Sequence, residues 1–514
     1  MDYVYKSKPY EHQDKVFRLS ADKECFAFLM EQGTGKTKPT IDTAAYLYET
    51  NKIDGLVIAA PNGVHRKWFV EDFPLSMPDR IPVKVCVWKA QSAPVLRNFE
   101  SLLMIPRSTK CLRVFMINIE ALSTKKGVEL VKRFLTTYRC LFVIDESGRI
   151  KNPGTNRTDA VVQLGALAPY RRILNGLPVS KSPFDLFSQF QFLDPKILGP
   201  SFFAFKARHA EFYPPNSGII KAILAKNPKV QQILAKNPNA NVTRFAPQIV
   251  VTDALGRPKY KQLERLKDQI APYSFRVTKA QCLDLPEKVY TTRFFEMTDK
   301  QRAIYEDVEE NSRATIDDDL YFIQHQLTKK LRLQQITSGF MGTEPNEEPK
   351  EICVAPEENP RLMLLKDTLE DLYGSVIIWA RFRKEIEWIA RMLGEDCVTY
   401  YGGTDTKDKP VNLEKFKSGD CRYLVGTAAS GGIGHNFTIA NYCVYYSNTF
   451  DYEQRAQSED RQHRIGQTNK VTYFDLQAEN SVDQDIVASL RAKQDLGDYM
   501  MGKKADYATV LFGD

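Results

Sequence analysis

The sequence lacks the features that mark membrane-spanning, secreted and zinc-stabilised proteins. No run of about 18 apolar residues occurs, so we expect no transmembrane helix. The nine cysteines include no C-x-x-C pair and the six histidines show no zinc-like spacing, which favours free thiols packed in the interior and no structural metal. The polar first residues lack the apolar centre of a signal peptide. We therefore expect an intracellular, cytoplasmic protein, associated with a nucleoid or with a host cytoplasm.

Neither sign of charge dominates the sequence. The net charge of +7 comes from 71 basic and 64 acidic residues, so a polyanionic partner is permitted but not required. Hydrophobic residues make up 43% of the chain and charged residues 26%, which is typical of a soluble globular protein. The length of 514 residues exceeds one core and predicts roughly three domain-sized units.

Short apolar runs alternate with helix-like segments in two parts of the chain. In the first part the runs cover residues 25–30, 55–61, 81–88, 111–118, 140–145 and 171–175. In the second part they cover residues 375–380, 397–403, 421–427, 441–448 and 471–476. This alternation predicts an α/β protein with two doubly wound, mostly parallel sheets.

The stretch between these parts, about 196–290, shows no strand pattern. It contains the hexapeptide ILAKNP twice, at 223–228 and 233–238. Each copy predicts a short basic helix that ends near Asn-Pro. Two interpretations stay open. The segment is either a basic prong that touches nucleic acid or a surface insertion with solvated lysines, and the second is the more common origin of such a charge run.

A glycine-rich turn follows the first apolar run, in EQGTGKT. Its glycines let backbone N–H groups approach phosphate oxygens, and the helix that follows adds its positive N-terminal dipole. Lys36 can reach the β- and γ-phosphates, and the Thr37 hydroxyl can ligate Mg²⁺. The match to the P-loop pattern is incomplete, because Met30 stands where its first glycine would fall. We predict an ATP-binding turn made of Gly33, Thr34, Gly35, Lys36 and Thr37.

Two adjacent carboxylates, Asp145 and Glu146, end another apolar run in LFVIDESGRIKNP. Ligands of open α/β sheets bind at the carboxyl edge of the strands, so these acids and the glycine-rich turn can face one crevice. Acids side by side repel unless a cation lies near them, which favours a metal. We predict that Asp145 holds Mg²⁺ and that Glu146 orients and deprotonates the water that attacks the γ-phosphate.

A basic cluster in the second part, QRAQSEDRQHRIGQ at 454–467, is predicted to be a helix. Gln457, Arg461 and Arg464 would then lie along one face of it. An arginine pair can stabilise the charge on a transferring phosphoryl group. If both α/β units serve one ATP, the nucleotide lies between them and its binding closes the cleft. The alternative is a solvated basic helix.

Taken together, these motifs resemble the Swi/Snf-like group of superfamily 2 DNA translocases over most of the chain. EQGTGKT resembles motif I, IAAPNGVHRKW motif Ia, IDESGRIKNP motif II and LNGLPVSKSP motif III. VIIWARF, GTAASGGIGHNFTIAN and QSEDRQHRIGQ resemble motifs IV, V and VI, of which the last is the most specific. The resemblance implies that Gln13 reads adenine and that Gly434 in motif V contributes to ATP binding. It also implies contacts to DNA phosphates, assigned to Lys67, Trp68, Arg381 and Thr427.

The resemblance further implies two RecA-like lobes with a helical insertion between them, ATP and Mg²⁺ as cofactors, and double-stranded DNA as partner. The expected boundaries are 1–195 for lobe 1, 196–290 for the insertion and linker, 291–498 for lobe 2, and 499–514 for a C-terminal tail. We predict a monomeric, DNA-stimulated ATPase that translocates along duplex DNA as the lobes open and close. Because accessory modules are not recognisable, the chain resembles a bacterial or phage-type motor, which a protein partner could target.

Two other functions stay open. One is a strand-separating helicase, or the motor of a restriction or repair assembly. The other is a non-hydrolysing DNA-binding remnant, which departures from the family pattern suggest. Ser147 and Gly148 stand where the family often has a small residue and then histidine, and Asn175 and Leu177 replace two threonines of motif III. These departures concern the coupling of the ATP site to DNA, not metal binding or water activation.

Overall fold

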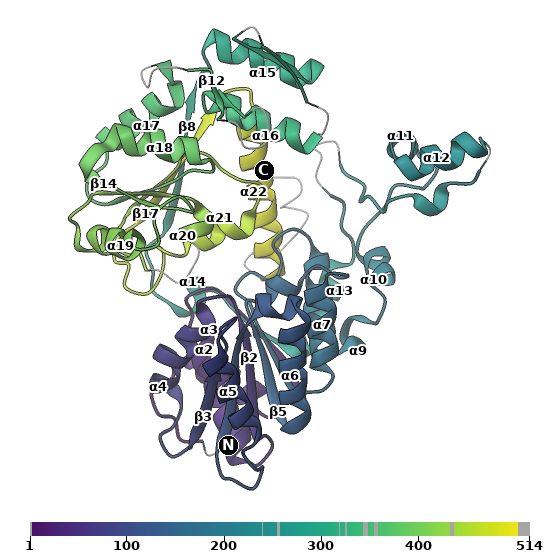
Figure 1. Cartoon of the computed structure of the whole chain (residues 1–514), viewed down its shortest axis with the longest axis vertical. Helices are drawn as coiled ribbons and strands as arrows, with labels where there is room; N and C mark the ends of the chain where they lie inside the picture. The colour runs from purple at the N-terminus through teal and green to yellow at the C-terminus, as the bar shows by residue number, and fades with distance from the viewer. Residues whose placement is uncertain are drawn as a thin grey trace. The chain divides into compact units, whose positions relative to one another are not determined.

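The computed structural model describes residues 3–238, 240–253, 258–317, 319–323, 326–342, 348–353, 358–431 and 436–501. The chain divides into two compact units. Unit 1 holds Met1–Glu31, Gly35–Val277 and the residues from Asp495 on, and unit 2 holds Gln32–Thr34 and Thr278–Gln494. Figure 1 colours the chain by residue number, so most of unit 1 is purple to blue and most of unit 2 is green to yellow.

Unit 1 is built on a parallel sheet. Within the described residues it has seven strands in the order β3-β4-β2-β5-β6-β1-β7. The strands are β1 Cys25–Met30, β2 Gly55–Ala60, β3 Val83–Val87, β4 Leu112–Asn118, β5 Cys140–Asp145, β6 Tyr170–Leu174 and β7 Ser274–Val277. The six apolar runs predicted here are confirmed as β1 to β6. β5 is buried along its whole length, as expected for a strand covered on both faces.

Helices lie on both sides of these strands (Figure 1). They are α1 Glu11–Ser20, α2 Thr37–Glu49, α3 Val64–Lys67, the π-helix η1 Trp68–Asp72, α4 Phe73–Ser76, α5 Ala93–Leu103, α6 Lys125–Thr137, the 3₁₀ turn η3 Ser147–Ile150, α7 Asn156–Gly165 and α8 Leu186–Leu193. Thr124 begins α6, because its side chain accepts a hydrogen bond from the N–H of Gly127. Phe134 of α6 then packs on Phe115 of β4, with ring centroids 5.8 Å apart. Such contacts fix the sheet whose carboxyl edge carries the predicted site.

The seventh strand, β7, lies in the stretch that showed no strand pattern in the sequence. It pairs with β1 from Ala27↔Ser274 to Met30↔Val277. It forms an edge of the sheet and its first three residues are only half-buried, so no apolar run marks it. The insertion expected at 196–290 therefore returns a strand to the sheet of unit 1 before the chain enters unit 2.

The insertion itself is mainly helical, as predicted. It contains α9 Pro195–Leu198, α10 Phe202–His209, α11 Gly218–Ala225, α12 Pro228–Lys236 and α13 Leu263–Ile270. The two ILAKNP copies end α11 and α12, which confirms two short basic helices. Asn227 of the first copy also begins α12, because its side chain accepts from the N–H of Lys229. The two helices share a small apolar cluster of their own, centred on Ile220, Leu224 and Val230.

Unit 2 contains a second parallel sheet, with six strands among the described residues, in the order β14-β15-β13-β16-β17-β8. The strands are β8 Lys288–Phe295, β13 Val376–Trp379, β14 Cys397–Tyr400, β15 Tyr423–Gly426, β16 Tyr442–Tyr445 and β17 Val471–Ala478. The five predicted runs are confirmed as β13 to β17. β8 is an additional, half-exposed edge strand. The predicted fold class, two doubly wound parallel-sheet lobes with a helical insertion, is therefore confirmed.

The longer helices of unit 2 are α15 Asp299–Asn311, α16 Gln326–Thr337, α17 Pro360–Glu370, α18 Arg383–Leu393, α19 Asp408–Ser418 and α21 Tyr452–Glu459, and α22 Val482–Met500 continues into unit 1. Unit 2 also contains the short helices α14 Lys279–Cys282 and α20 Ala428–Gly431 and the 3₁₀ turn η8 Gly394–Asp396. Two antiparallel strand pairs lie outside its main sheet: β9 Arg313–Ile316 with β10 Asp319–Phe322, and β11 Phe340–Met341 with β12 Lys350–Glu351. No helix in the described part of the chain is long and apolar enough to cross a membrane. All nine cysteines are free thiols and are buried or half-buried, as expected.

Candidate functional site

The turn after β1 is shaped by two glycines with positive φ angles. Gly33 and Gly35 have φ angles of +87° and +81°, which residues with a Cβ rarely adopt. At Gly35 a Cβ would also lie 2.3 Å from Nε2 of Gln13, so the close approach requires glycine. Lys36 follows at the start of α2, and its Nζ donates to the last backbone oxygen of β1 at 2.9 Å. The turn thus places Lys36 and Thr37 together at the N-terminus of a helix.

Gln13 of α1 is held against this turn by both ends of its amide. Its Oε1 accepts from the N–H of Tyr10 at 2.9 Å, and its Nε2 donates to the backbone oxygen of Gly35 at 3.0 Å. The side chain is buried. The structure therefore brings Gln13 and the glycine-rich turn together in one fixed arrangement.

Asp145 and Glu146 lie at the carboxyl end of β5. Asp145 is 8% exposed, and its Oδ2 accepts from the indole Nε1 of Trp68 at 3.0 Å. Burial raises the pKa of Asp145, while the Trp68 hydrogen bond and the charge of Lys36 act against that rise. Glu146 has φ +51° and ψ +57°, a left-handed backbone conformation that is uncommon for a residue with a Cβ. The two acids therefore differ in their surroundings. The carboxylate of Asp145 is held by the indole of Trp68, whereas Glu146 has a strained backbone conformation at the start of a turn.

Trp68 is buried, whereas a contact to DNA requires an exposed side chain. The indole is 1% exposed and is committed to the Asp145 carboxylate, so the structure places it inside unit 1 beside motif II. It begins the π-helix η1, a feature that is frequent at functional sites. Asp72 ends the same π-helix, and burial together with the charges of Glu71 and Asp145 raises the pKa of Asp72 to about 6. Lys67 is half-exposed and pairs with Glu71, with Nζ and Oε2 3.4 Å apart.

Strand order brings motif III between motifs I and II. β6 lies between β5 and β1, so the carboxyl ends of these strands are neighbours. Asn175, the first residue after β6, donates its backbone N–H to the oxygen of Phe28 in β1 at 3.0 Å. Its Nδ2 donates to Oε1 of Gln189 at 2.8 Å, and Ser147 Oγ donates to the same oxygen at 2.6 Å. Gln189 was not identified from the sequence, since it lies 42 residues beyond Ser147 within the apolar run of α8.

The oxygen atoms at this edge fit Mg²⁺. The Thr37 hydroxyl and the Asp145 carboxylate are the hard ligands that this ion prefers. No group of three or more His, Cys, Asp or Glu side chains in the described part of the chain could hold a metal alone. Because proteins commonly bind Mg²⁺ through one or two side chains together with substrate phosphates, Thr37 and Asp145 would be enough to hold it beside a bound nucleotide.

In unit 2, the helix predicted at 454–467 ends at Glu459, so this prediction is wrong beyond that residue. Arg461 and Arg464 lie on the turns that follow, not on one helical face with Gln457 of α21. A tertiary contact ends the helix at this point. The side chain of Gln462 donates to the backbone oxygen of Tyr442 at 3.0 Å and ties the chain to the start of β16. Arg461 is buried and Arg464 is half-buried.

The inward face of α21 carries a charge network that the sequence analysis missed. Arg455 Nη1 donates to Asp475 Oδ1 at 2.5 Å, its Nε donates to Glu459 Oε1 at 2.7 Å, and its guanidinium lies 3.4 Å from the ring centroid of Tyr445. Lys288 Nζ lies 3.0 Å from the second oxygen of Glu459. Burial alone would raise the pKa of Glu459, but the charges of Lys288 and Arg455 outweigh burial and lower it. The i,i+4 spacing of Arg455 and Glu459 was the signal in the sequence.

Two of the predicted DNA-contact residues, Arg381 and Thr427, line one pocket in unit 2. It has a volume of about 180 Å³, and Ser447, Asn448 and Arg455 also line it. Burial lowers the pKa of Arg381, which nevertheless stays a cation in the working pH range. Of the other lining groups, Ser447 donates to Glu385, and Asn448 and Arg455 donate to Asp475, so these donors are already used inside the protein.

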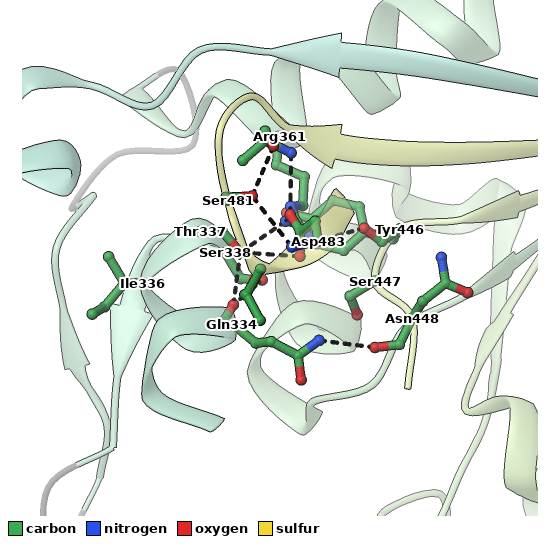
Figure 2. A network of polar contacts seen from close by, with 12 residues as sticks. Gln334, Ile336, Thr337, Ser338, Arg361, Tyr446, Ser447, Asn448, Ser481 and Asp483 are labelled. Carbon is green, nitrogen blue, oxygen red and sulfur yellow. Dashed lines mark hydrogen bonds and ion pairs between the residues drawn. The ribbon is translucent and has the colours of Figure 1, made fainter. Parts of the chain in front are cut away.

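Figure 2 shows the buried network that supports one wall of this pocket. Arg361 donates through Nη1 to the backbone oxygen of Tyr446 at 2.8 Å and forms a buried ion pair with Asp483. Gln334 donates to the backbone oxygen of Asn448 at 3.0 Å. These bonds fix the chain immediately after β16, where Ser447 and Asn448 face the pocket. Gly434, predicted to contact ATP, lies outside the described residues.

Comparisons with known proteins match two family models to successive parts of the chain. The family model of the SNF2-related domain matches residues 21–350, and the helicase conserved C-terminal domain matches residues 361–466. A probable chromatin-remodeling complex ATPase chain of Oryza sativa subsp. japonica is 25% identical over 506 residues, covering 93% of this chain and 39% of that protein. A putative ATP-dependent helicase/translocase, YwqA of Bacillus subtilis, is 22% identical over 371 residues, covering 70% of this chain and 35% of that protein.

A solved structure of a Sulfolobus solfataricus SWI2/SNF2 ATPase core in complex with dsDNA aligns over 100% of this chain and 97% of that one, with 21% identity and a TM-score of 0.40. The chain spans less than half the length of the two curated relatives above. The SNF2-related model covers well over half of this sequence, including the glycine-rich turn, the paired acids and the segment after β6. The chain therefore belongs to the SNF2-related family, and its later part matches the helicase conserved C-terminal domain.

Proposed function

We propose that the protein is a Mg²⁺-dependent ATPase that is stimulated by duplex DNA and translocates along it. The observation that carries this proposal is the juxtaposition, in unit 1, of Lys36 and Thr37 at a glycine-shaped helix start with Asp145 and Glu146 at the end of a nearby strand. This is the arrangement that phosphoryl transfer to water requires, because charge stabilisation and positioning supply most of that catalysis.

Each residue has a distinct role in the proposed reaction. Lys36 binds the β- and γ-phosphates, and Gln13 contacts the base. Thr37 and Asp145 hold Mg²⁺, which when bound neutralises charge on the phosphate oxygens. Glu146 orients the attacking water and takes its proton. We further propose that Gln457, Arg461 and Arg464 of unit 2 contribute to stabilising the transferring phosphoryl group when the two units close around ATP.

The distribution of charge supports a polyanionic partner. Residues 213–252 contain five basic and no acidic side chains, whereas the rest of the chain contains 66 basic and 64 acidic ones. Most of the net charge of +7 therefore comes from the α11–α12 segment. All five cations are exposed: Lys221, Lys226, Lys229, Lys236 and Arg244. Together with the pocket lined by Arg381 and Thr427, this favours contacts to the DNA backbone, which carry affinity rather than sequence preference.

The test is ATPase rate with duplex DNA, single-stranded DNA and RNA as separate cofactors, with displacement of a triplex-forming strand as the readout of translocation. We expect the largest rate with duplex DNA, and triplex displacement without strand separation. Stronger stimulation by single strands would contradict a duplex translocase. Separation of a blunt duplex would instead support a strand-separating helicase.

Glu146→Gln separates binding from chemistry in the same assay. Because the amide cannot accept the water's proton, we expect kcat to fall by about 10²–10⁴-fold while ATP binding is retained. Turnover equal to that of the unaltered chain would exclude Glu146 as the base. A chain without any ATPase activity, with or without DNA, would indicate a non-hydrolysing remnant.

A further inference from the structure

A single buried amide, that of Gln189, joins motif II to motif III. Its Oε1 accepts from Ser147 Oγ at 2.6 Å and from Asn175 Nδ2 at 2.8 Å. Its Nε2 donates to the backbone oxygens of Pro178 at 2.9 Å and Asp185 at 2.7 Å. Two donors meet the oxygen and two carbonyl oxygens meet the nitrogen, so the network itself fixes the orientation of the amide.

This network is closed to solvent and neutral. Gln189 and Ser147 are 0% exposed and Asn175 is 2% exposed. Asn175 is itself held, because its Oδ1 accepts from the N–H of Leu177 at 2.9 Å. A buried network in which every member is satisfied is rigid, since any displacement leaves a polar group unpaired in the interior. Ser147 therefore has one defined position relative to the end of β6.

A second link ties the other end of the same turn. Lys151 Nζ donates to Ser180 Oγ at 2.6 Å. Asp185 in turn accepts from the backbone N–H groups of Ser180 and Lys181 at 2.9 Å and 2.8 Å. The 3₁₀ turn from Ser147 to Ile150 is thus held from both sides by the segment that follows β6.

Glu146 immediately precedes this turn and has the left-handed backbone conformation described above. A residue with a Cβ keeps such a conformation only where its surroundings hold it there. Ser147 is the adjacent residue, and its side chain donates the hydrogen bond to Gln189 that holds the start of the turn. The backbone conformation of Glu146 is therefore connected to the position of Ser147.

We infer that Gln189 is a positioning residue for the proposed hydrolysis: through Ser147 it holds Glu146 in the backbone conformation that aims its carboxylate at the attacking water. This inference rests on the proposed function. It assigns a hydrogen-bonded link to Asn175, which replaces a threonine of motif III, and to Ser147, which precedes the departure from the family pattern at Gly148. Gln189 does not touch substrate in this role.

The test is Ser147→Ala, which removes one hydroxyl and leaves the other three bonds of Gln189 in place. Ser188→Ala is the matched control, because Ser188 is equally buried and its Oγ has no hydrogen-bond partner among the described residues. We expect Ser147→Ala to lower kcat about 10- to 100-fold with the KM for ATP nearly unchanged, the size of effect that misplacement of a reacting group produces. Ser188→Ala should leave both constants unchanged.

A second pair of variants distinguishes positioning from a structural effect. In a Glu146→Gln background, Ser147→Ala should cause no further loss of rate, because the group that it positions is already gone. Gln189→Leu should lower kcat at least as much as Ser147→Ala, whereas Gln191→Leu, which removes a hydrogen bond to Gly199 on the same helix, should spare it.

Equal kinetics of Ser147→Ala and Ser188→Ala would overturn this inference alone, and so would an additive loss in the Glu146→Gln background. Absence of turnover in the unaltered chain would overturn the proposed function and this inference with it. The two failures are therefore distinguishable from one set of rate measurements.

Discussion

The two units support their functional side chains in opposite ways. In unit 1 the site is held mainly by neutral groups: the amide of Gln189, the hydroxyl of Ser147 and the indole of Trp68. In unit 2 it is held by buried charges, above all Arg455 between Glu459 and Asp475. Neutral donors orient a carboxylate without adding a fixed charge beside it, which suits residues that must bind a metal or take a proton.

The charged support of unit 2 has a different consequence. Buried charges are tolerated because each has its partner, and removal of one partner leaves the other uncompensated. Arg455 also lines the pocket with Arg381 and Thr427, so the same side chain links the network to the proposed phosphate contacts. We therefore expect changes of single supporting residues to lower folding stability more in unit 2 than in unit 1, and to impair catalysis mainly in unit 1.

The largest effect is expected from Arg455→Met. It leaves Glu459 and Asp475 buried beside one remaining cation, so unit 2 should lose about 3–5 kcal/mol of its free energy of unfolding. Arg133→Met is the control, because the Arg133–Glu100 pair is largely exposed and should contribute no more than about 1 kcal/mol. Native-state hydrogen exchange, read separately for the two units, measures both. Equal losses of unfolding free energy in Arg455→Met and Arg133→Met would contradict the expected difference between the two units.

A smaller effect is expected from Trp68→Phe, which keeps the ring and removes the N–H that donates to Asp145. A hydrogen bond to a charged group contributes about 1.5–3 kcal/mol, so unit 1 should be destabilised by that amount. The half-saturating Mg²⁺ concentration for ATPase activity should also rise, because Asp145 is less firmly held. Trp88→Phe, another buried tryptophan of the same unit, should leave the Mg²⁺ dependence unchanged.

The smallest effect is expected on the surface, from Lys221, Lys229 and Lys236 changed together to Gln. If the three side chains contact phosphates, the slope of log affinity for duplex DNA against log salt should become shallower by about 2–3. Lys84, Lys110 and Lys132, which are exposed elsewhere on unit 1, provide a variant of equal charge. An identical slope in the two triple variants would favour solvated lysines on a surface insertion.

The strands that carry the site could be predicted because their sequences reflect burial on both faces. Cys25–Met30 and Cys140–Asp145 are continuous apolar runs, and each is followed directly by polar residues that belong at a ligand-binding edge. The edge strands β7 and β8 were not predicted, because their sequences SFRV and KVYTTRFF mix charged and hydroxyl residues with the apolar ones and form no continuous apolar run.

The errors in the predicted site have a common cause. The helix at 454–467 was extended too far because periodicity cannot register the bond from Gln462 to Tyr442 that turns the chain. Trp68 was expected to contact DNA because the resemblance to motif Ia implies a phosphate contact at that position. Only the packing of η1 against β5 shows that its N–H meets Asp145.

The sequence by itself determined which chemistry this protein carries: a glycine turn with Lys36 and Thr37, and the acids Asp145 and Glu146 at the end of a buried strand. Residue types and local order are enough for that, since such motifs act through groups that are close in the chain. Only the tertiary structure decided what holds them. Ser147 meets Gln189 across 42 residues, and a hydrogen bond between side chains so far apart depends on how β5, β6 and α8 pack.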